Sequence, residues 1–223
     1  MKSQLLQLYL SRQQDCLNVK NRFPNDDLAG PLLMSPNSLY ASSSNRLLII
    51  GQETKGWNYF VNDFERQMQT YEEFNVGDGY YSSPFWNVIR KVEKALGNPP
   101  HSCAWTNISK FDLDGGRSYD EYESTIANID NILIEEVNII KPDVCIFFTG
   151  PNFDHRVKGI FEGIKYNTIE DWSLRELAQL SHPSLPVNSF RTYHPNYLRR
   201  AGFESDFVKY IETIIAKFRS KKV

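Results

Sequence analysis

The chain contains few cysteines, no long apolar run and no surplus of positive charge. Its three cysteines, Cys16, Cys103 and Cys145, lie far apart and form no CxxC pair, so we expect neither structural disulfides nor a cysteine metal site. No stretch approaches the roughly 20 apolar residues that span a bilayer, and residues 1–20 do not resemble a secretion signal. These absences favour a protein of the reducing cytoplasm that has no membrane partner.

The balance of charge argues against a strong general affinity for nucleic acid. The chain carries 25 Lys and Arg against 27 Asp and Glu, which gives a formal net charge of −2. Because tight nucleic-acid binders usually have a clear excess of positive charge, contact with a phosphate backbone would depend on a local basic patch. The length of 223 residues and the 41% apolar content are ordinary for one globular domain, which we expect to span residues 1–223.

Short apolar runs alternate with amphipathic stretches along the chain, which is typical of a parallel α/β sheet. We expect strands at residues 47–50, 103–108, 143–148 and 187–193. We expect helices at residues 1–20, 84–96, 119–140, 151–161 and 204–218, with 21–45 as a wrapping loop that follows the N-terminal helix. The predicted fold is a three-layer α/β/α sandwich around a central, mainly parallel sheet of four strands.

Polar residues follow each of the four predicted strands. They include Gln52, Glu53 and Lys55 after the first strand, Asn107 and Lys110 at the second, Asn152 after the third, and His194 and Asn196 after the last. The carboxyl ends of parallel strands meet at one edge of a sheet, and open α/β sheets bind their ligands at that edge. We therefore predict a pocket there.

The chemistry that this combination suits is displacement at a glycosidic carbon. A carboxylate at Glu53 can position a water and offset the positive charge that grows on the sugar, while His194 can stabilise the departing base. Asn107 carries both a donor and an acceptor, so it can read the edge of a pyrimidine. Rings that could stack on the base are those of Trp57, Tyr80, Tyr81, Phe85 and Trp86.

Each of these residues, taken alone, also has a structural role open to it. Glu53 could cap the helix that follows, Asn107 could stabilise a turn, and His194 could be a hydrogen-bonded core histidine. Phe85 fits the apolar stripe of its own predicted helix. The functional interpretation therefore depends on the residues occurring together at one sheet edge.

Five segments, in order, resemble motifs of the uracil-DNA glycosylase superfamily. GQETKGW is similar to the motif written GQDPYH in one branch and GEAPG in another, and TYHPNYLRR is similar to the later His-Pro-Ser motif with its wedge residue. SPFWNVI, WTNISK and IKPDVCIFFTGPN resemble segments that lie between these two motifs. The resemblance covers residues 47 to 218 and implies the α/β/α fold of that superfamily.

The resemblance also implies roles for individual residues. Glu53 falls at the water-activating aspartate of GQDPYH and Gln52 at the glutamate of GEAPG, so both are catalytic candidates. Asn107 matches the base-reading asparagine, His194 matches the histidine that stabilises the leaving base, and Trp57, Tyr81 and Phe85 complete the base site. The implied DNA contacts are Lys55, Lys110, Asn152, Asn196, Tyr197, Leu198, Arg199 and Arg200, with Tyr197 or Leu198 as the wedge that fills the gap of a flipped nucleotide.

Three features depart from the family pattern. Thr54 and Lys55 replace the proline and tyrosine of GQDPYH. Phe111 stands where the iron–sulfur branch has cysteine, so we expect no cluster, and no metal or other cofactor. His182, in His182-Pro183-Ser184, matches the later motif more literally than His194 does, but no apolar strand precedes it, so we prefer His194.

The leading hypothesis is a monomeric, monofunctional DNA glycosylase-like hydrolase that removes uracil or a related damaged base from single- or double-stranded DNA. A second hypothesis is a non-catalytic relative that binds a nucleobase or nucleic acid, which the altered first motif and the acidic pI of about 6.1 favour. A third is a hydrolase of free nucleosides or nucleotides, which needs no DNA-binding surface.

Overall fold

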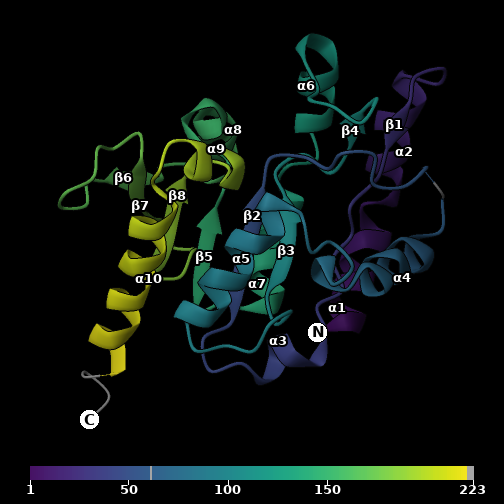
Figure 1. Ribbon diagram of the computed structural model, residues 1–223. Coiled ribbons are helices and arrows are strands. Elements are labelled where there is room, and N and C mark those ends of the chain that lie inside the picture. The colour runs from purple at the N-terminus through teal and green to yellow at the C-terminus, as the bar shows by residue number, and fades with distance from the viewer. Residues whose placement is uncertain (61, 220–223) are drawn as a thin grey trace.

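The centre of the computed structural model, which describes residues 1–60 and 62–219, is a six-stranded and mostly parallel sheet (Figure 1). The strand order is β3-β2-β5-β8-β7-β6. The parallel strands are β2 (Leu47–Gly51), β3 (Ala104–Asn107), β5 (Val144–Phe147) and β8 (Asn188–Thr192). Two antiparallel pairings complete this sheet, β8 with β7 (Leu177–Ser181) and β7 with β6 (Lys165–Asn167). A separate two-stranded antiparallel sheet pairs β1 (Leu28–Ala29) with β4 (Asp112–Leu113).

The four predicted strands are the four parallel strands, but the predicted sheet size of four is wrong. The sheet has six strands because β7 and β6 extend it beyond β8. Neither strand has the continuous apolar run that marks a strand buried on both faces. β6 has exposed Lys165 and Asn167, and β7 places a half-buried Gln179 among its apolar residues. The hydrophobic pattern of the sequence therefore did not predict β6 and β7.

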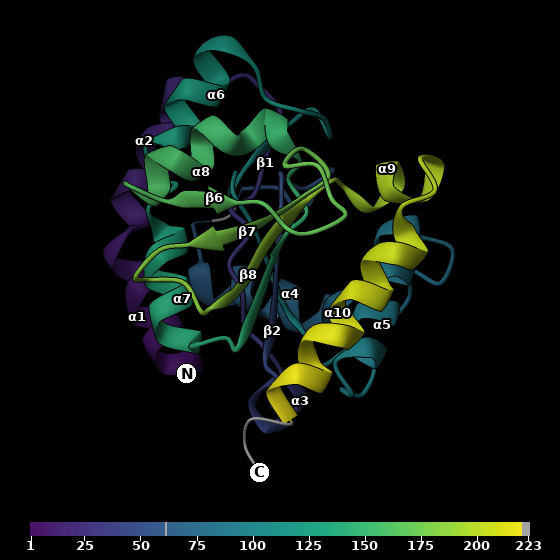
Figure 2. The ribbon, with the colours of Figure 1, turned by 90° about the vertical axis from the view of Figure 1, so that its left-hand side faces the viewer.

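Helices cover both faces of the sheet, an arrangement compatible with a three-layer sandwich (Figure 2). One face is covered by α1 (Lys2–Ser11) and α7 (Ile132–Ile140), and the other by α5 (Pro84–Ala95) and α10 (Glu204–Arg219). The remaining α-helices of the described residues are α2 (Gln13–Arg22), α3 (Ser38–Ser42), α4 (Phe64–Phe74), α6 (Asp120–Ala127), α8 (Asp154–Ile160) and α9 (Pro195–Arg200). Two short 3-10 helices, η1 (Asn75–Gly77) and η2 (Pro151–Phe153), follow α4 and precede α8. In the described part of the chain, no helix is both long and apolar enough to cross a membrane.

Two of the predicted helices are each interrupted. The first divides into α1 and α2 at Arg12, whose φ of −102° and ψ of 4° leave the helical region. The second divides into α6 and α7 across residues 128–131, which contain two asparagines and an aspartate, residue types that favour a helix only weakly. Asp130 in this break is held by Arg156 of α8 at 2.6 Å, which fixes the direction of the chain between the two helices.

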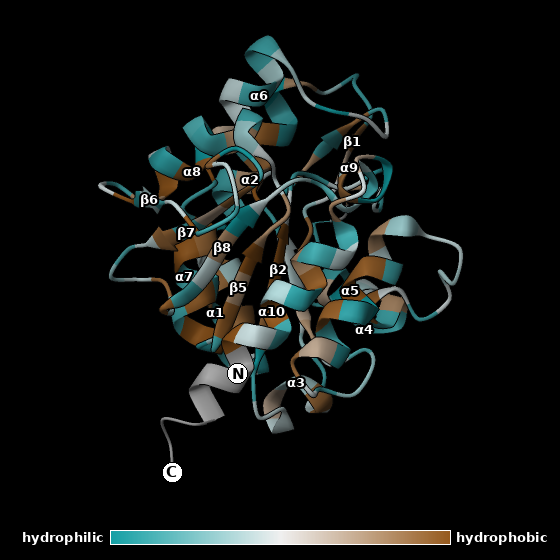
Figure 3. Cartoon of the chain, turned by 60° about the vertical axis from the view of Figure 1, so that its left-hand side comes forward, coloured by the Kyte–Doolittle hydropathy of each residue, from teal (hydrophilic) through white to brown (hydrophobic). Residues whose placement is uncertain are grey.

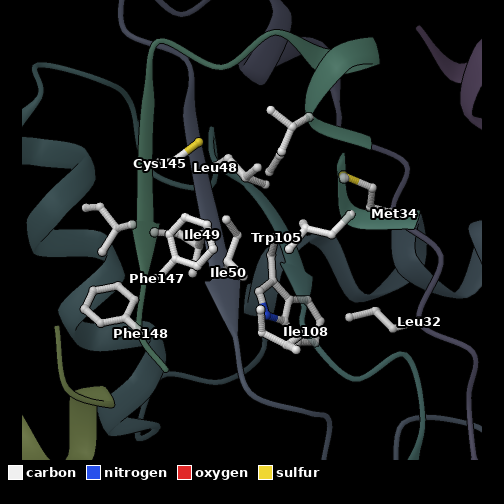
Figure 4. Close-up of a cluster of buried hydrophobic side chains, with 14 of the residues drawn as sticks. Leu32, Met34, Leu48, Ile49, Ile50, Trp105, Ile108, Cys145, Phe147 and Phe148 are labelled. Atoms are coloured by element: carbon white, nitrogen blue, oxygen red, sulfur yellow. The ribbon is translucent and has the colours of Figure 1, made fainter. Parts of the chain in front are cut away.

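The core is continuous from the first helix to the last. Figure 3 shows the apolar residues concentrated on the central strands, and Figure 4 shows Leu48, Ile49 and Ile50 of β2 between side chains of β3 and β5. All five residues of β2 are buried, because helices lie on both sides of it. The segment predicted as a wrapping loop also enters the core, since residues 32–34 are completely buried.

A completely buried ion pair links the N-terminal helix to the sheet. The Nζ atom of Lys110 lies 2.6 Å from Oε2 of Glu136 on α7, and it donates to Oγ1 of Thr106 at 2.5 Å. The hydroxyl of Tyr9 on α1 donates to the other Glu136 oxygen at 2.9 Å. The prediction that Lys110 contacts DNA is therefore wrong, because its side chain has no exposed surface and its charge is already paired.

Loss of this ion pair should destabilise the fold strongly. Lys110→Met leaves the Glu136 carboxylate buried without a positive partner, for which we expect a loss of about 3–5 kcal/mol in the free energy of unfolding. The double variant Lys110→Met/Glu136→Leu removes both charges and should recover most of that loss. Urea denaturation of the three proteins measures the effect, and a single variant as stable as the wild type would contradict it.

Candidate functional site

A cavity of about 640 Å³ opens at the carboxyl edge of the parallel strands. It lies beyond the ends of β2 and β3, and α4, α5 and the start of α9 complete its wall. The predicted site residues that line it are Gln52, Glu53, Lys55, Trp57, Phe85, Asn107 and His194. Residues from four separate parts of the chain thus meet in one pocket.

The register between β2 and β3 brings Gly51 of the segment GQETKGW beside Asn107. Gly51 pairs directly with Asn107 in the parallel ladder. A Cβ atom at position 51 would lie 2.2 Å from Oδ1 of Asn107, so only glycine allows the amide to occupy this place. The close approach accounts for the glycine at the end of the strand.

A buried carboxylate that the sequence analysis missed shapes the loop after β2. Asp112 on β4 accepts hydrogen bonds from the backbone N–H groups of Gly56 at 3.0 Å and Trp57 at 3.3 Å, and from the hydroxyl of Thr54. The amide of Gln52 donates to the carbonyl of Thr149 at 2.7 Å, which ties the loop to the end of β5. An aspartate between Phe111 and Leu113 carries no sequence signal for this role, because its partners lie about 55 residues earlier in the chain.

Glu53 presents one satisfied and one free carboxylate oxygen. Its Oε2 accepts from the backbone N–H of Ser118 at 3.0 Å and from the Ser118 hydroxyl at 3.1 Å, while Oε1 is buried without a partner. Burial raises the pKa of Glu53, and the hydrogen bonds from Ser118 and the charge of Arg117 oppose that rise. Glu53 does not cap the next helix, because the side chain of Asp63 caps α4.

His194 is held as a neutral imidazole with one defined donor. Its Nδ1 accepts the backbone N–H of Asn196 at 3.2 Å, which leaves the ring proton on Nε2. Burial lowers the pKa of His194 below its ordinary value, so the ring stays uncharged near pH 7. The ring centroid of Phe85 lies 5.5 Å away, which brings the starts of α5 and α9 together at the pocket.

The alternative histidine, His182, lies at the opposite end of the strands, near the amino end of β8. His182 follows β7, which runs antiparallel to β8 and pairs Leu180 with Ser189 near the start of that strand. Its Nδ1 accepts from the backbone of Ser184 at 3.1 Å, so the local turn is the same as at His194. Because β7 runs antiparallel to β8, His182 emerges at the opposite end of the strands from the pocket.

Six aromatic residues line the pocket. They are Trp57, Phe74, Tyr80, Phe85, Trp86 and Trp105. Phe74 lies 5.2 Å from Trp57, 5.4 Å from Trp86 and 5.6 Å from Trp105 between ring centroids. Phe74 and Trp105 were not predicted as site residues, because aromatic residues on a helix and in a strand are ordinary core residues by pattern.

The remaining predicted site residues do not line the pocket. Leu198 is completely buried, so it is wrong as a wedge, whereas Tyr197 is 44% exposed. Tyr81 is 81% exposed and lies outside the pocket lining. The other exposed members of the predicted DNA-contact set are Lys55, Asn152, Asn196, Arg199 and Arg200, of which Lys55 lines the pocket.

Comparison of the chain with known protein families and with curated proteins found no match. Within residues 1–60 and 62–219, no group of three or more His, Cys, Asp or Glu side chains is arranged to hold a metal ion. The ionisable and amide side chains that line the pocket are those of Gln52, Glu53, Lys55, Glu73, Asn107 and His194, beside a set of aromatic rings.

The close approach of Gly51 to Asn107 can be tested by a double-mutant cycle. Gly51→Ala should lower the free energy of unfolding by about 1–3 kcal/mol, because the added methyl group overlaps the Asn107 amide. In an Asn107→Ala background the same substitution should cost much less. The free energies of unfolding are measured by urea denaturation. If Gly51→Ala lowers them equally in both backgrounds, overlap with the Asn107 amide does not cause the loss.

Glu53→Gln should stabilise the protein at neutral and alkaline pH. Since burial raises the folded-state pKa of Glu53 above its unfolded value, ionisation opposes folding above the folded-state pKa, and this penalty disappears below the unfolded pKa. The unfolding midpoints of the variant and the wild type should therefore diverge as pH rises through this window.

Glu72→Gln provides a control of opposite sign. Burial acts to raise the pKa of Glu72, but hydrogen bonds from Lys2 and Ser35 outweigh it and hold that pKa below its ordinary value. This variant should lose stability relative to the wild type as pH rises through the lowered pKa towards the ordinary one. The same pH trend for both variants would contradict the assignment for Glu53.

Proposed function

We propose that this chain is a glycosylase-like hydrolase that breaks the N-glycosidic bond of uracil or a related damaged base in DNA. The observation that carries the proposal is the meeting of Glu53, Asn107 and His194 in one pocket at the carboxyl edge of the sheet. The resemblance of five ordered segments to the uracil-DNA glycosylase superfamily agrees with it. The proposal implies the three-layer α/β/α sandwich of that superfamily, acting as a single monomeric domain.

Glu53 supplies the base for the attacking water. Its unpaired Oε1 can accept a proton from water while the water oxygen forms a bond to the sugar C1′. The bond between C1′ and the base nitrogen breaks, and its electron pair leaves with the base. A carboxyl group whose pKa is raised is a stronger proton acceptor than an ordinary one, and its negative charge offsets the positive charge on the sugar.

His194 and Asn107 act on the departing base. The Nε2–H of the neutral imidazole can donate to the base as negative charge develops on it, so no charged acid is needed. The Nδ2 atom of Asn107 is buried without a partner and can donate to a carbonyl oxygen of the base. Phe85, beside His194, offers a ring on which the base can stack.

A hydrolase of free nucleosides or nucleotides is the second candidate. The burial of Lys110 and Leu198 favours it, since two members of the predicted DNA-contact set cannot reach a strand. Arg199 is also partly engaged, with its Nε atom 3.3 Å from Glu204. The first candidate depends on Lys55, Asn152, Asn196, Tyr197 and Arg200 for its contacts, with Tyr197 as the wedge.

Base release from oligonucleotides tests the proposal. The wild-type protein should release base from single- or double-stranded DNA that carries uracil, hypoxanthine or an oxidised pyrimidine. Glu53→Gln and His194→Ala should each lower the rate by about 10²–10⁴-fold, because each removes a group that acts only in the transition state. His182→Ala removes the same type of side chain at the other sheet edge and should leave the rate unchanged.

The substrate series separates the candidates. Release from mononucleosides but not from oligonucleotides would replace the first candidate with the second. Saturable base binding without release from either would indicate a non-catalytic relative. A rate that falls equally in His182→Ala and His194→Ala would refute the assignment of the pocket.

A further inference from the structure

Two tryptophans of the pocket wall carry buried indole N–H groups that have no acceptor. Nε1 of Trp57 and Nε1 of Trp105 both lack a hydrogen-bond partner, and both residues line the cavity. Their rings meet edge to face, with centroids 5.4 Å apart and an interplanar angle of 75°. Buried N–H groups are rarely left unpaired in folded proteins, so such groups beside a cavity point to a ligand that accepts their hydrogen bonds.

The Trp105 indole lies beside the unpaired amide of Asn107. Trp105 and Asn107 are two residues apart on β3, which places their side chains on the same face of the sheet. A Cβ atom built on Gly51 would lie 3.6 Å from Nε1 of Trp105 and 2.2 Å from Oδ1 of Asn107, so both side chains crowd the same end of β2. Trp105 appears in Figure 4 with its indole nitrogen in blue. Three unpaired N–H donors therefore belong to this wall of the pocket.

The third tryptophan of the wall offers a contrast. Trp86 packs 5.4 Å from Trp105 in the same aromatic cluster and lines the same cavity. Its indole nitrogen is not one of the buried atoms without a partner, and Arg90 lies over its ring at 5.6 Å. Trp86 thus contributes ring surface to the wall.

We propose that the base taken by this pocket is an oxopurine with carbonyl oxygens on both rings, which accepts hydrogen bonds from Trp57 and Trp105 as well as Asn107. The inference rests on the proposed function and names its substrate class. A monocyclic dione such as uracil has two carbonyl oxygens and could meet three donors only by sharing one oxygen between two of them. Adenine has no carbonyl oxygen and would turn its amino group towards N–H groups. A cavity of about 640 Å³ is within the usual range for sites that hold molecules larger than one small ring.

Four free bases on one ring skeleton test the inference by titration calorimetry on the full chain. Adenine has no carbonyl oxygen, hypoxanthine has one, xanthine has two and uric acid has three. Affinity should rise along this series, and uric acid should bind at least tenfold more tightly than either adenine or uracil. Equal affinities for adenine and uric acid would overturn the inference.

Three tryptophan variants isolate the indole N–H groups. Trp57→Phe and Trp105→Phe keep an aromatic ring but remove the donor, and each should weaken uric acid binding about tenfold while leaving adenine binding unchanged. Trp172→Phe makes the same chemical change at a tryptophan that packs on Phe203 and does not line the pocket, and it should leave both affinities unchanged. Because the variants and the wild type are compared on the same ligand, the ligand charge is constant, and any loss of affinity for uric acid is due to the missing N–H donor. If Trp105→Phe does not fold, Trp57→Phe and Trp172→Phe remain as the matched pair.

The outcome separates the base preference from the reaction. Uric acid binding that depends on Trp57 and Trp105, without base release from any oligonucleotide or nucleoside, would support the preference and reject the proposed reaction. Release of uracil from DNA with no effect of the two indole variants on uric acid binding would support the reaction and reject the preference.

Discussion

The parallel pairing of β2 with β3 is the constraint on which the candidate site depends. It sets Gly51 beside Asn107, and the absence of a side chain at position 51 leaves room for the Asn107 amide. A slip of one residue in this register would turn Asn107 to the other face of the sheet and remove it from the pocket. β5 and β8 continue the same strand direction, so His194 emerges at the edge where Glu53 begins its loop.

Buried charged side chains have two different roles in this fold. Lys110 and Glu136 neutralise each other inside the protein and connect the N-terminal helix to the sheet, away from the pocket. At the pocket, Asp112 fixes the loop by accepting backbone N–H groups, and Glu53 is held through only one of its oxygens. The raised pKa of Glu53 is a cost in stability that an acid–base role would explain.

Sequence patterns identified the parts of the fold that are buried on both sides. The four apolar runs are the parallel strands, and the capped amphipathic segment beginning at Pro84 is α5. The same reasoning failed where burial is partial, since β6 and β7 lack a continuous apolar run. It also failed where a side chain's partner is distant in sequence. A lysine after a strand looks like a surface charge unless its acceptor, here Glu136, is known.

The sequence by itself determined the alternation of strands and helices, and with it the edge at which Glu53, Asn107 and His194 had to emerge. Hydrophobic periodicity is a local property, so it can be read without the fold. Only the tertiary structure decided that β7 runs antiparallel and carries His182 to the end of the strands opposite the pocket. It also decided that Asp112 holds the loop after β2 and that Trp57 and Trp105 keep unpaired N–H groups in the pocket wall. Strand direction, long-range hydrogen bonds and unpaired donors all depend on which distant segments become neighbours, and no local pattern records that.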